Sequence, residues 1–511
     1  MHRRISVFLA LTLPAFAVEF TTLQNKVLFG YQGWFDCPNG GSGSWVHWAK
    51  GSPTATNLTV DMYPDLSEFN TADLCAAGAM TSGGKTSYLF PSRNAAIINA
   101  HFTWMEQFGL DGVLVQRFIG EAPGKRSSGD VVLKNIMTAA VAHGRTFAIE
   151  YDLSGGSEAT FAQAVQTDWM YLVDSLKVTA NPNYLHHNGK PVVSVWGPGL
   201  NDGHVPKTPA PLATFIQWFK STAAAKYQAV YIGGTPSGWR TLDADALTDP
   251  AWTPVYKSMD VVQPWTVGRY IDTTTATNWK STHITPDLAA TNTAGNLYMP
   301  VIFPGFSWYN LNMTNSTGIK NQIPRKGGYF IWKQAYNAKA AGASMLKIAM
   351  FDEVDEGTAM FKVASLRSQA PDQGYWLTLD ADGYNLPSDW YLRLAQKITE
   401  MFHGTLPPTP TMPLDPAHPV NVFANPGRKV HARLRVNRVE GGVFFESLTE
   451  DAASLRIFTP GGKFLRALIL RNNRAFWDER DAAGNALSPG IYFLKVTSPS
   501  TRFVEPFSIT R

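Results

Sequence analysis

Short apolar runs alternate with longer amphipathic stretches through most of this chain. Between residues 22 and 403 there are eight such runs, at 27–31, 112–116, 146–150, 191–196, 229–232, 261–263, 299–303 and 345–351. Intervening stretches such as 96–108 and 131–143 carry apolar residues at spacings of three and four, which is typical of a helix. Apolar strands that alternate with amphipathic helices predict a parallel sheet buried on both faces. Eight such units favour an α/β fold of the closed (β/α)8 TIM barrel type over an open sheet.

The pattern changes after residue 403. Residues 404–427 are rich in Pro and Thr without periodicity, so we expect a semi-rigid linker there. From 428 to 511 the chain has short alternating segments, such as 454–458 and 490–496, separated by Gly-Gly, Asn-Asn and Pro-Gly turns. Strands of this length and spacing predict a small C-terminal β-sandwich.

The first residues have the features of a secretory signal peptide. Residues 1–17 begin with Met-His-Arg-Arg, continue in the apolar run 5–16 and end in Ala-Phe-Ala. A first core strand is the alternative. Because no apolar run of about 20 residues follows, we expect no transmembrane segment and a secreted protein, whether extracellular, periplasmic or at the cell surface. Export favours an oxidising compartment, where the only two cysteines, Cys37 and Cys75, can form a disulfide; two free buried thiols are the alternative.

Composition narrows the class of protein further. Hydrophobic residues make up 44% of the chain and charged residues 16%, which is enough apolar material for a large core and excludes a disordered chain. The formal charge of +4 is too small to draw the protein onto nucleic acid. The sequence has no H-E-x-x-H motif, Walker loop, dinucleotide fingerprint or G-x-S-x-G elbow, so we expect no metal and no cofactor.

Polar and aromatic residues gather just after the predicted strands. In a barrel these positions form the C-terminal face, where active sites lie. Their carboxylates, indoles, amide and guanidinium suit a sugar, because pyranose C–H faces stack on Trp and Tyr while the hydroxyls need polar partners. We predict that a polysaccharide or oligosaccharide contacts Trp34, Asp36, Trp48, Arg117, Asp152, Trp196, Gln263, Trp265, Trp308, Tyr309 and Asp352.

Each of these residues also has a plainer alternative role. A single Trp packs in a core more often than it faces a ligand. Arg117 and Arg269 can form structural ion pairs with Asp152 or Glu121, and Asp36 can cap a loop.

Two glutamates after the last predicted strand are the candidate catalytic residues. Hydrolysis of a glycosidic bond needs two carboxyl groups, and those of Glu353 and Glu356 can converge to roughly 5 Å, as in retaining enzymes, if the chain turns after Phe351. If the chain stays extended, they diverge. Neighbouring acids repel one another, so one glutamate should keep its proton to higher pH, as a general acid requires. A solvated loop or a weak calcium site is the alternative, although the EF-hand spacing is absent.

Several motifs resemble the glycoside hydrolase family 99 and 71-like group, which includes endo-α-mannosidases and endo-α-mannanases. Residues 350–358 (MFDEVDEGT) resemble the group's N-E-W-x-E-G signature, and residues 31–35 (YQGWF) with 45–48 (WVHW) resemble its first-strand pattern. Similar matches occur at 109–113 (GLDGV) and 188–192 (NGKPV), so that the resemblance covers about residues 22–400.

The resemblance implies a TIM barrel and a role for each glutamate. The group's first glutamate is the base on the sugar 2-hydroxyl, giving a 1,2-anhydro intermediate, and the second is the acid/base; by position these are Glu353 and Glu356. The sequence departs from the signature at three positions: Asp352 replaces Asn, Val354 replaces Trp, and Asp355 adds a charge.

The tail has a resemblance of its own. Residues 476–484 (FWDERDAAG) and 489–493 (PGIYF) resemble the W-D-G-x-D-x-x-G…G-x-Y pattern of FlgD-like immunoglobulin-type domains. Such modules end some bacterial secreted enzymes and sometimes act in sorting. This implies contact with a cell surface or a secretion machinery.

Together these features predict a secreted glycoside hydrolase. The residues indicate a glycan substrate, and the resemblance adds endo-action on an α-linked polysaccharide or oligosaccharide. One alternative is a glycan-binding protein without turnover on a barrel scaffold. Another is a structural cell-surface protein whose Trp residues are core.

Overall fold

The structure is a computed structural model that forms two compact units, 1–419 and 420–511, each described here by itself. The residues described are 18–119, 126–312, 318–419, 434–439, 442–447, 454–459, 464–468, 474–488, 490–497 and 502–509. The predicted signal peptide, 1–17, lies outside them.

The first unit is built on one parallel sheet. Its strands are paired in the order β10 (Leu297–Tyr298), β9 (Val261–Val262), β8 (Val230–Gly234), β7 (Lys190–Trp196), β5 (Thr146–Asp152), β4 (Gly112–Phe118), β1 (Val27–Tyr31), β12 (Leu346–Ile348) and β11 (Val301–Ile302). Each of the eight predicted apolar runs contains or overlaps one of these strands. The predicted parallel α/β barrel is confirmed.

The seventh run closes the barrel. The run, 299–303, contains β11, which pairs with β12, and it directly follows β10, which lies just before the predicted start and pairs with β9. Between them, the N–H of Met299 donates to Val262, and the C=O of Pro300 accepts from Lys347. Proline has no N–H to donate, but the carbonyl of Pro300 still continues the pairing. One segment of chain therefore joins the two ends of the sheet.

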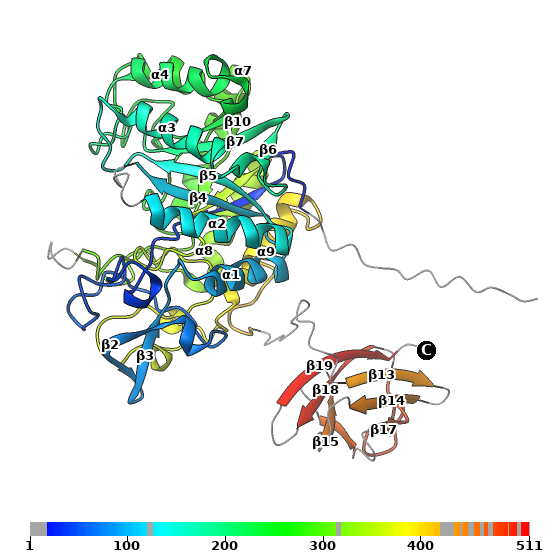
Figure 1. Ribbon diagram of the computed structural model, residues 1–511. Coiled ribbons are helices and arrows are strands. Elements are labelled where there is room, and N and C mark those ends of the chain that lie inside the picture. Colours follow the sequence, from blue (N-terminus) through cyan, green and yellow to red (C-terminus); the bar gives the residue numbers. More distant parts are fainter. Residues whose placement is uncertain are drawn as a thin grey trace, which may run out of the picture. The chain divides into compact units, whose positions relative to one another are not determined.

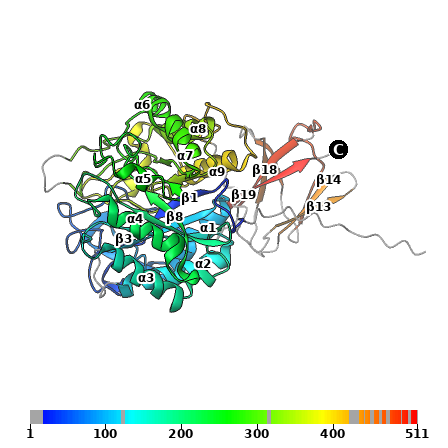
Figure 2. The same ribbon diagram turned by 90° about the horizontal axis from the view of Figure 1, so that it is seen from above.

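Helices surround the strands of this unit. Figure 2 shows β1 and β8 near its centre with helices around them. The α-helices are α1 (Ala95–Gln107), α2 (Arg126–His143), α3 (Phe161–Asp174), α4 (Pro209–Gln217), α5 (Trp252–Tyr256), α6 (Thr273–Trp279), α7 (Thr285–Ala294), α8 (Tyr329–Ala341) and α9 (Trp390–His403). Short π-helical segments occur at Trp218–Thr222 and Lys280–Ile284. Single 3-10 turns occur at Pro38–Gly40, Thr71–Asp73, Val178–Ala180, Ala225–Tyr227, Lys326–Gly328, Arg367–Gln369 and Leu379–Asp382.

Amphipathic packing explains the two helices predicted from spacing. The prediction at 96–108 corresponds to α1, whose Ile97, Phe102 and Met105 are buried in the core. The prediction at 131–143 corresponds to α2, which lies beside α1 (Figure 1). Within the described ranges no helix is long and apolar enough to span a bilayer.

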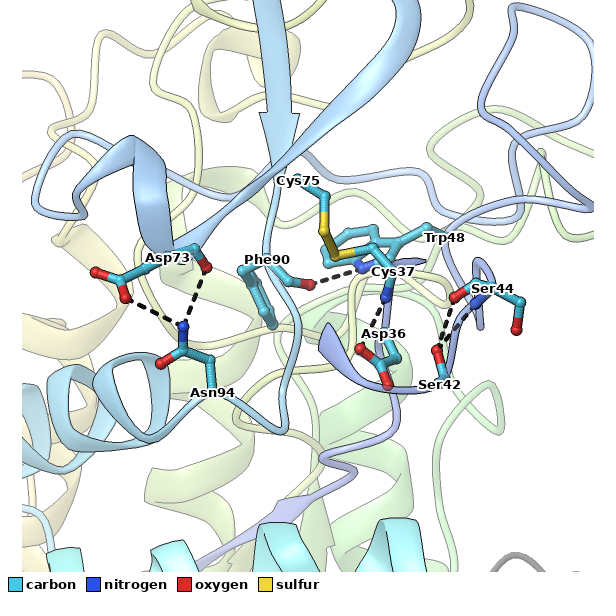
Figure 3. Close-up of a disulfide and its surroundings, with 9 residues drawn as sticks. All are labelled: Asp36, Cys37, Ser42, Ser44, Trp48, Asp73, Cys75, Phe90 and Asn94. Carbon is cyan, nitrogen blue, oxygen red and sulfur yellow. Dashed lines mark hydrogen bonds between the residues drawn. A yellow bond between two sulfur atoms is a disulfide. The ribbon is translucent and has the colours of Figure 1, made fainter. Parts of the chain in front are cut away.

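A disulfide ties the loop after β1 to a hairpin. The hairpin consists of β2 (Cys75–Ser82) and β3 (Lys85–Leu89), and Cys37 is bonded to Cys75 (Figure 3). The indole of Trp48 lies beside the disulfide and donates to the C=O of Phe90 at 2.9 Å. The predicted pairing of the two cysteines is confirmed. Outside the barrel sheet's main path, the short β6 (His186–His187) pairs antiparallel with β7.

The first part of the Pro/Thr-rich segment packs on the barrel unit. The indole of Trp332 donates to the C=O of Thr409 at 3.1 Å, and Met412 is buried. The boundary between the two units falls after Pro419. Residues 420–427, the rest of the predicted linker, lie outside the described ranges.

The second unit contains two antiparallel sheets. One consists of β13 (Leu434–Val439), β14 (Gly442–Ser447) and β17 (Arg474–Trp477). The other has the order β16 (Phe464–Leu468), β15 (Ser454–Phe458), β18 (Gly490–Thr497) and β19 (Arg502–Ile509). A single apolar cluster joins them, with Phe445 and Trp477 from the first sheet and Leu455, Ile457 and Leu494 from the second. This is the arrangement expected of a small β-sandwich.

Candidate active site

The chain turns a few residues after β12. Residues 354–357 form a turn, and the N–H of Phe361 donates back to the C=O of Phe351 at 3.0 Å. The C=O of Glu356 accepts from Ser307, which follows β11. The bend on which the catalytic prediction depends is therefore present, and it lies at the C-terminal end of the barrel strands.

Glu353 is held by a hydrogen bond to each carboxyl oxygen. Gln32, in the loop after β1, donates its side-chain amide to Oε1 at 2.7 Å, and Thr358 donates its hydroxyl to Oε2 at 2.7 Å. The side chain is almost fully buried. Burial, followed by the nearby charges of Glu356 and Asp355, raises the pKa of Glu353 well above its ordinary value, whereas the two donors act in the opposite direction.

Glu356 lies in a contrasting environment. Its side chain is partly exposed, and within the described ranges no group donates a hydrogen bond to its carboxyl. Burial first, and then the charge of Asp355, raises the pKa of Glu356 to about 8. Donors stabilise a carboxylate, so the hydrogen bonds from Gln32 and Thr358 favour the charged form of Glu353, a support that Glu356 lacks, although burial raises the pKa of both residues.

Asp352 is a structural residue rather than a ligand contact. Its two carboxyl oxygens accept from the N–H groups of Gln32 and Gly33, at 2.7 and 2.8 Å. The side chain is fully buried, which raises its pKa to about 7 despite these bonds. Each N–H group faces a different carboxylate oxygen, and an Asn at this position would place its NH2 group, a donor, opposite one of them. This explains the departure from the N-E-W-x-E-G signature and corrects the predicted substrate contact.

A histidine that was not among the predicted residues faces Asp355. His47 Nδ1 lies 3.7 Å from Asp355 Oδ2, and the His47 ring stacks on Trp34 with 3.9 Å between centroids. The predicted sugar contact Trp34 also stacks on Phe118, at the end of β4. Trp34 is only partly buried, so part of its surface reaches the mouth of the barrel.

Trp196 and Trp265 form a second aromatic group at the same face. Their rings meet edge to face at 5.4 Å, and both are partly exposed. Lys347, whose side chain is buried in the barrel interior, places its Nζ 5.5 Å from the Trp265 ring centroid. Gln263 is buried and accepts a hydrogen bond of 3.3 Å from Lys347, so it supports this group without reaching the surface.

The barrel interior contains an ion pair that the sequence analysis missed. Lys347 Nζ lies 2.7 Å from both oxygens of Glu150, and neither side chain is exposed. Gln116 and Ser194 donate to the same carboxylate at 2.9 and 2.8 Å. A lysine within an otherwise apolar predicted strand was the available signal.

Trp308 and Tyr309 lie beside the catalytic turn. Both are partly exposed, and the N–H of the preceding Ser307 donates to the C=O of Glu356. Asp61 holds this loop by accepting from the Ser307 hydroxyl and from the N–H of Tyr309 at 2.8 Å. These two aromatic residues are therefore next to Glu356, as predicted for residues at strand ends.

Three other predicted contacts have structural roles instead. Trp48 is fully buried, and its indole N–H donates to the C=O of Phe90. Asp36 is buried and accepts from the N–H of Cys37, which is the loop-capping alternative. Arg117 forms two bonds of 2.7 Å to Asp168 and one of 3.1 Å to Asp130. An ion pair was the alternative for Arg117, but its partners are not Asp152 or Glu121, the two considered. Arg269 likewise forms an ion pair, with Asp245 at 2.8 Å. Glu121 lies outside the described ranges.

Asp152 is buried at the end of β5. Its Oδ1 accepts from the N–H of Ser154 at 2.8 Å, and burial raises its pKa.

Among the residues described, no group of three His, Cys, Asp or Glu side chains is placed to hold a metal ion.

Comparison with known proteins bears on the fold. No protein-family model matches the sequence, and a search of curated proteins finds no match. Two solved structures of the GH99 endo-α-mannosidase from Bacteroides thetaiotaomicron, one in complex with bis-tris-propane, each match with a TM-score of 0.54 and 18% identity. Each match covers 75% of this chain and 99% of the other. The chain shares the fold of that barrel. At this level of identity the match concerns the fold, and the function is inferred from the site.

Proposed function

We propose that this protein is a secreted glycoside hydrolase that cleaves an α-linked polysaccharide or oligosaccharide at internal bonds, with Glu353 and Glu356 as its catalytic pair. The observation that carries the proposal is the contrast between the two carboxyls. One accepts a hydrogen bond on each oxygen. The other has no described donor; the pKa of both is raised, that of Glu356 to about 8. Glycosidic hydrolysis needs such a pair of unlike carboxyl groups.

The contrast assigns a role to each residue. Glu356 keeps its proton near neutral pH and is placed to protonate the leaving oxygen. Glu353, whose charge Gln32 and Thr358 stabilise, is the base. In the mechanism that the sequence resemblance implies, Glu353 removes the proton of the 2-hydroxyl, that oxygen displaces the leaving group at C1, and water then opens the 1,2-anhydro ring with Glu356 as the base.

The partly exposed aromatic residues supply the sugar contacts. Trp34, Trp196, Trp265, Trp308 and Tyr309 each lie at the C-terminal end of a barrel strand or in the loop that follows it. Pyranose C–H faces stack on such rings. Endo-action and an α-linkage rest on the likeness in motif and fold to an enzyme named as an endo-α-mannosidase.

Secretion is supported by two features of the chain. The N-terminal 17 residues read as a signal peptide, and the Cys37–Cys75 disulfide is of a kind that persists in oxidising compartments. We further propose that the β-sandwich is an immunoglobulin-like, FlgD-like module that contacts a cell surface or a secretion machinery.

A substrate screen tests the proposal. Reducing-end release is measured with the wild type and with Glu356→Gln on α-mannans, α-glucans, xylans and arabinans, and binding is measured by calorimetry. We expect release from an α-linked polymer by the wild type, a loss of several orders of magnitude in the variant, and retained affinity in both. Binding by both without release supports a glycan-binding protein instead, and no binding supports a structural one.

A further inference from the structure

A second group of hydrogen-bonded side chains lies at the same face of the barrel, apart from the two glutamates. Ser154 follows β5, while Asp202 and His204 lie in the loop after β7. Ser154 Oγ is 2.9 Å from His204 Nε2, and His204 Nδ1 is 2.5 Å from Asp202 Oδ1. A serine, a histidine and an aspartate connected in this order are the arrangement that activates a serine hydroxyl as a nucleophile.

The contacts of His204 determine which nitrogen carries the proton. A carboxylate has only acceptor oxygens, so the bond to Asp202 requires the proton on Nδ1. The lone pair of Nε2 then faces the Ser154 hydroxyl, as a general base requires.

Packing fixes the plane of the His204 ring. The ring meets the indole of Trp196 edge to face at 5.0 Å. Gly197, at φ +109°, passes so close that an added Cβ would lie 3.2 Å from His204 Cδ2. The imidazole is therefore held in the orientation that points Nε2 at Ser154.

The loop around Ser154 supplies the other parts of such a site. The N–H of Ser154 donates to the buried Asp152 at 2.8 Å. The Ser154 hydroxyl also hydrogen-bonds to that carboxyl, so its proton must turn from Asp152 to His204 Nε2 before His204 can take it. The next residue, Gly155, is exposed, and its N–H donates no hydrogen bond within the described ranges. The N–H that follows a nucleophile is a common donor to the oxyanion of acyl transfer. Ser154 itself is partly exposed, so a substrate can reach it.

We propose that Ser154, His204 and Asp202 hydrolyse O-acyl esters carried on a glycan. That the alcohol is a sugar rests on the function proposed above and on the partly exposed indoles of Trp196 and Trp265, which adjoin His204. The ester hydrolysis itself rests on the three side chains and on the N–H of Gly155. Removal of acyl groups at the mouth of the barrel gives the glutamate pair an unsubstituted chain.

The reaction balances with water as the only co-reactant. Ser154 Oγ attacks the acyl carbon while His204 Nε2 takes its proton, and the oxyanion is held by the N–H of Gly155. The ester C–O bond breaks, and the sugar oxygen leaves with the proton from His204. Water then attacks the acyl-serine, gives a proton to His204, and displaces Ser154 Oγ, which recovers that proton. The products are a free sugar hydroxyl and a carboxylic acid.

Labelling and acetate release test this proposal on the full chain. The probes are a fluorophosphonate, with the adduct located by mass spectrometry, and a chemically O-acetylated α-glycan from which acetate and reducing ends are measured separately. We expect an adduct on Ser154 and release of acetate by the wild type. Ser154→Ala and His204→Gln should lower the acetate rate at least about 100-fold.

Ser157→Ala is the matched control, because Ser157 lies in the same loop, is exposed and has no described side-chain partner. It should keep the adduct and the wild-type rate. Circular dichroism shows whether each variant is folded. Acetate release without reducing ends supports the ester proposal while the glycosidase proposal fails. A wild type that releases no acetate, a rate that Ser154→Ala does not lower, or an adduct only elsewhere overturns the ester proposal.

Discussion

Gln32 Nε2 lies 2.7 Å from Glu353 Oε1. A residue in the loop after β1, the first barrel strand, therefore holds a carboxyl in the loop after β12, the last barrel strand along the chain. The two residues are 321 positions apart in the sequence and meet because β1 pairs directly with β12. Asp352 reinforces the junction by binding the N–H groups of Gln32 and Gly33. The geometry of the proposed base thus depends on the closure of the barrel.

Gln32→Ala should shift the pH profile of hydrolysis. A hydrogen bond to a charged group is worth about 1.5–3 kcal/mol, and its loss raises the pKa of Glu353. We expect the acid limb of kcat/KM to move up by about one pH unit, with a lower kcat. Gln24→Ala, before β1, is the control, since its side chain has no described partner. An acid limb that stays in place in Gln32→Ala contradicts the assigned role.

Glu356→Gln should lose activity and gain stability at neutral pH. The folded protein holds this proton with a pKa of about 8, against 4.5 ordinarily, so its contribution to stability is complete below pH 4.5 and is lost as pH rises through about 8. Glutamine stays neutral and avoids that loss. We expect a Tm about 2–5 °C above the wild type at pH 8 and no difference at pH 4. Equal Tm values at both pH values would show that Glu356 ionises freely in the folded protein.

Lys347→Met should destabilise the barrel strongly. It leaves the Glu150 carboxylate buried without its cation, which costs about 3–5 kcal/mol. Lys347→Met with Glu150→Gln removes both charges and should recover much of the loss, since Gln116 can still donate to the remaining carbonyl oxygen while the Ser194 hydroxyl accepts from the new NH2 group. Thermal unfolding of both variants checks this. A double variant no more stable than the single one means that the lysine acts through packing instead.

Reduction of the disulfide should loosen the first loop. Cys37 and Cys75 are 38 residues apart, and a bond that closes such a loop stabilises a protein by about 4 kcal/mol in the chain-entropy model. We expect Cys37→Ala/Cys75→Ala to lower the Tm by several degrees and to make residues 37–75 sensitive to protease. The bond has no stabilising role if limited proteolysis and melting match the wild type.

Local pattern was enough to predict the barrel but only part of the site. Apolar runs mark buried strands directly, and the eight runs include Val27–Tyr31 with the observed bounds. The seventh run, 299–303, was delimited less well: it contains β11 but begins just after β10, the part of this segment that pairs with β9. Side-chain direction is a tertiary property: Trp34 and Trp48 both follow β1, yet one is partly exposed and the other is buried behind the disulfide. Partners distant in sequence, such as Asp168 for Arg117 and Glu150 for Lys347, could not be predicted without the fold.

Turnover of a glycosyl fluoride tests the central claim most directly. Fluoride leaves without needing a proton, so the first step on this substrate needs the base Glu353 but not the acid Glu356, whose later role as the base on water comes after fluoride has left. With the α-glycosyl fluoride of the sugar identified by the screen, we expect Glu356→Gln to retain fluoride release while losing the natural glycan. Glu353→Gln should lose both. If either variant hydrolyses the natural glycan at the wild-type rate, the assignment of these two glutamates as the catalytic pair is wrong.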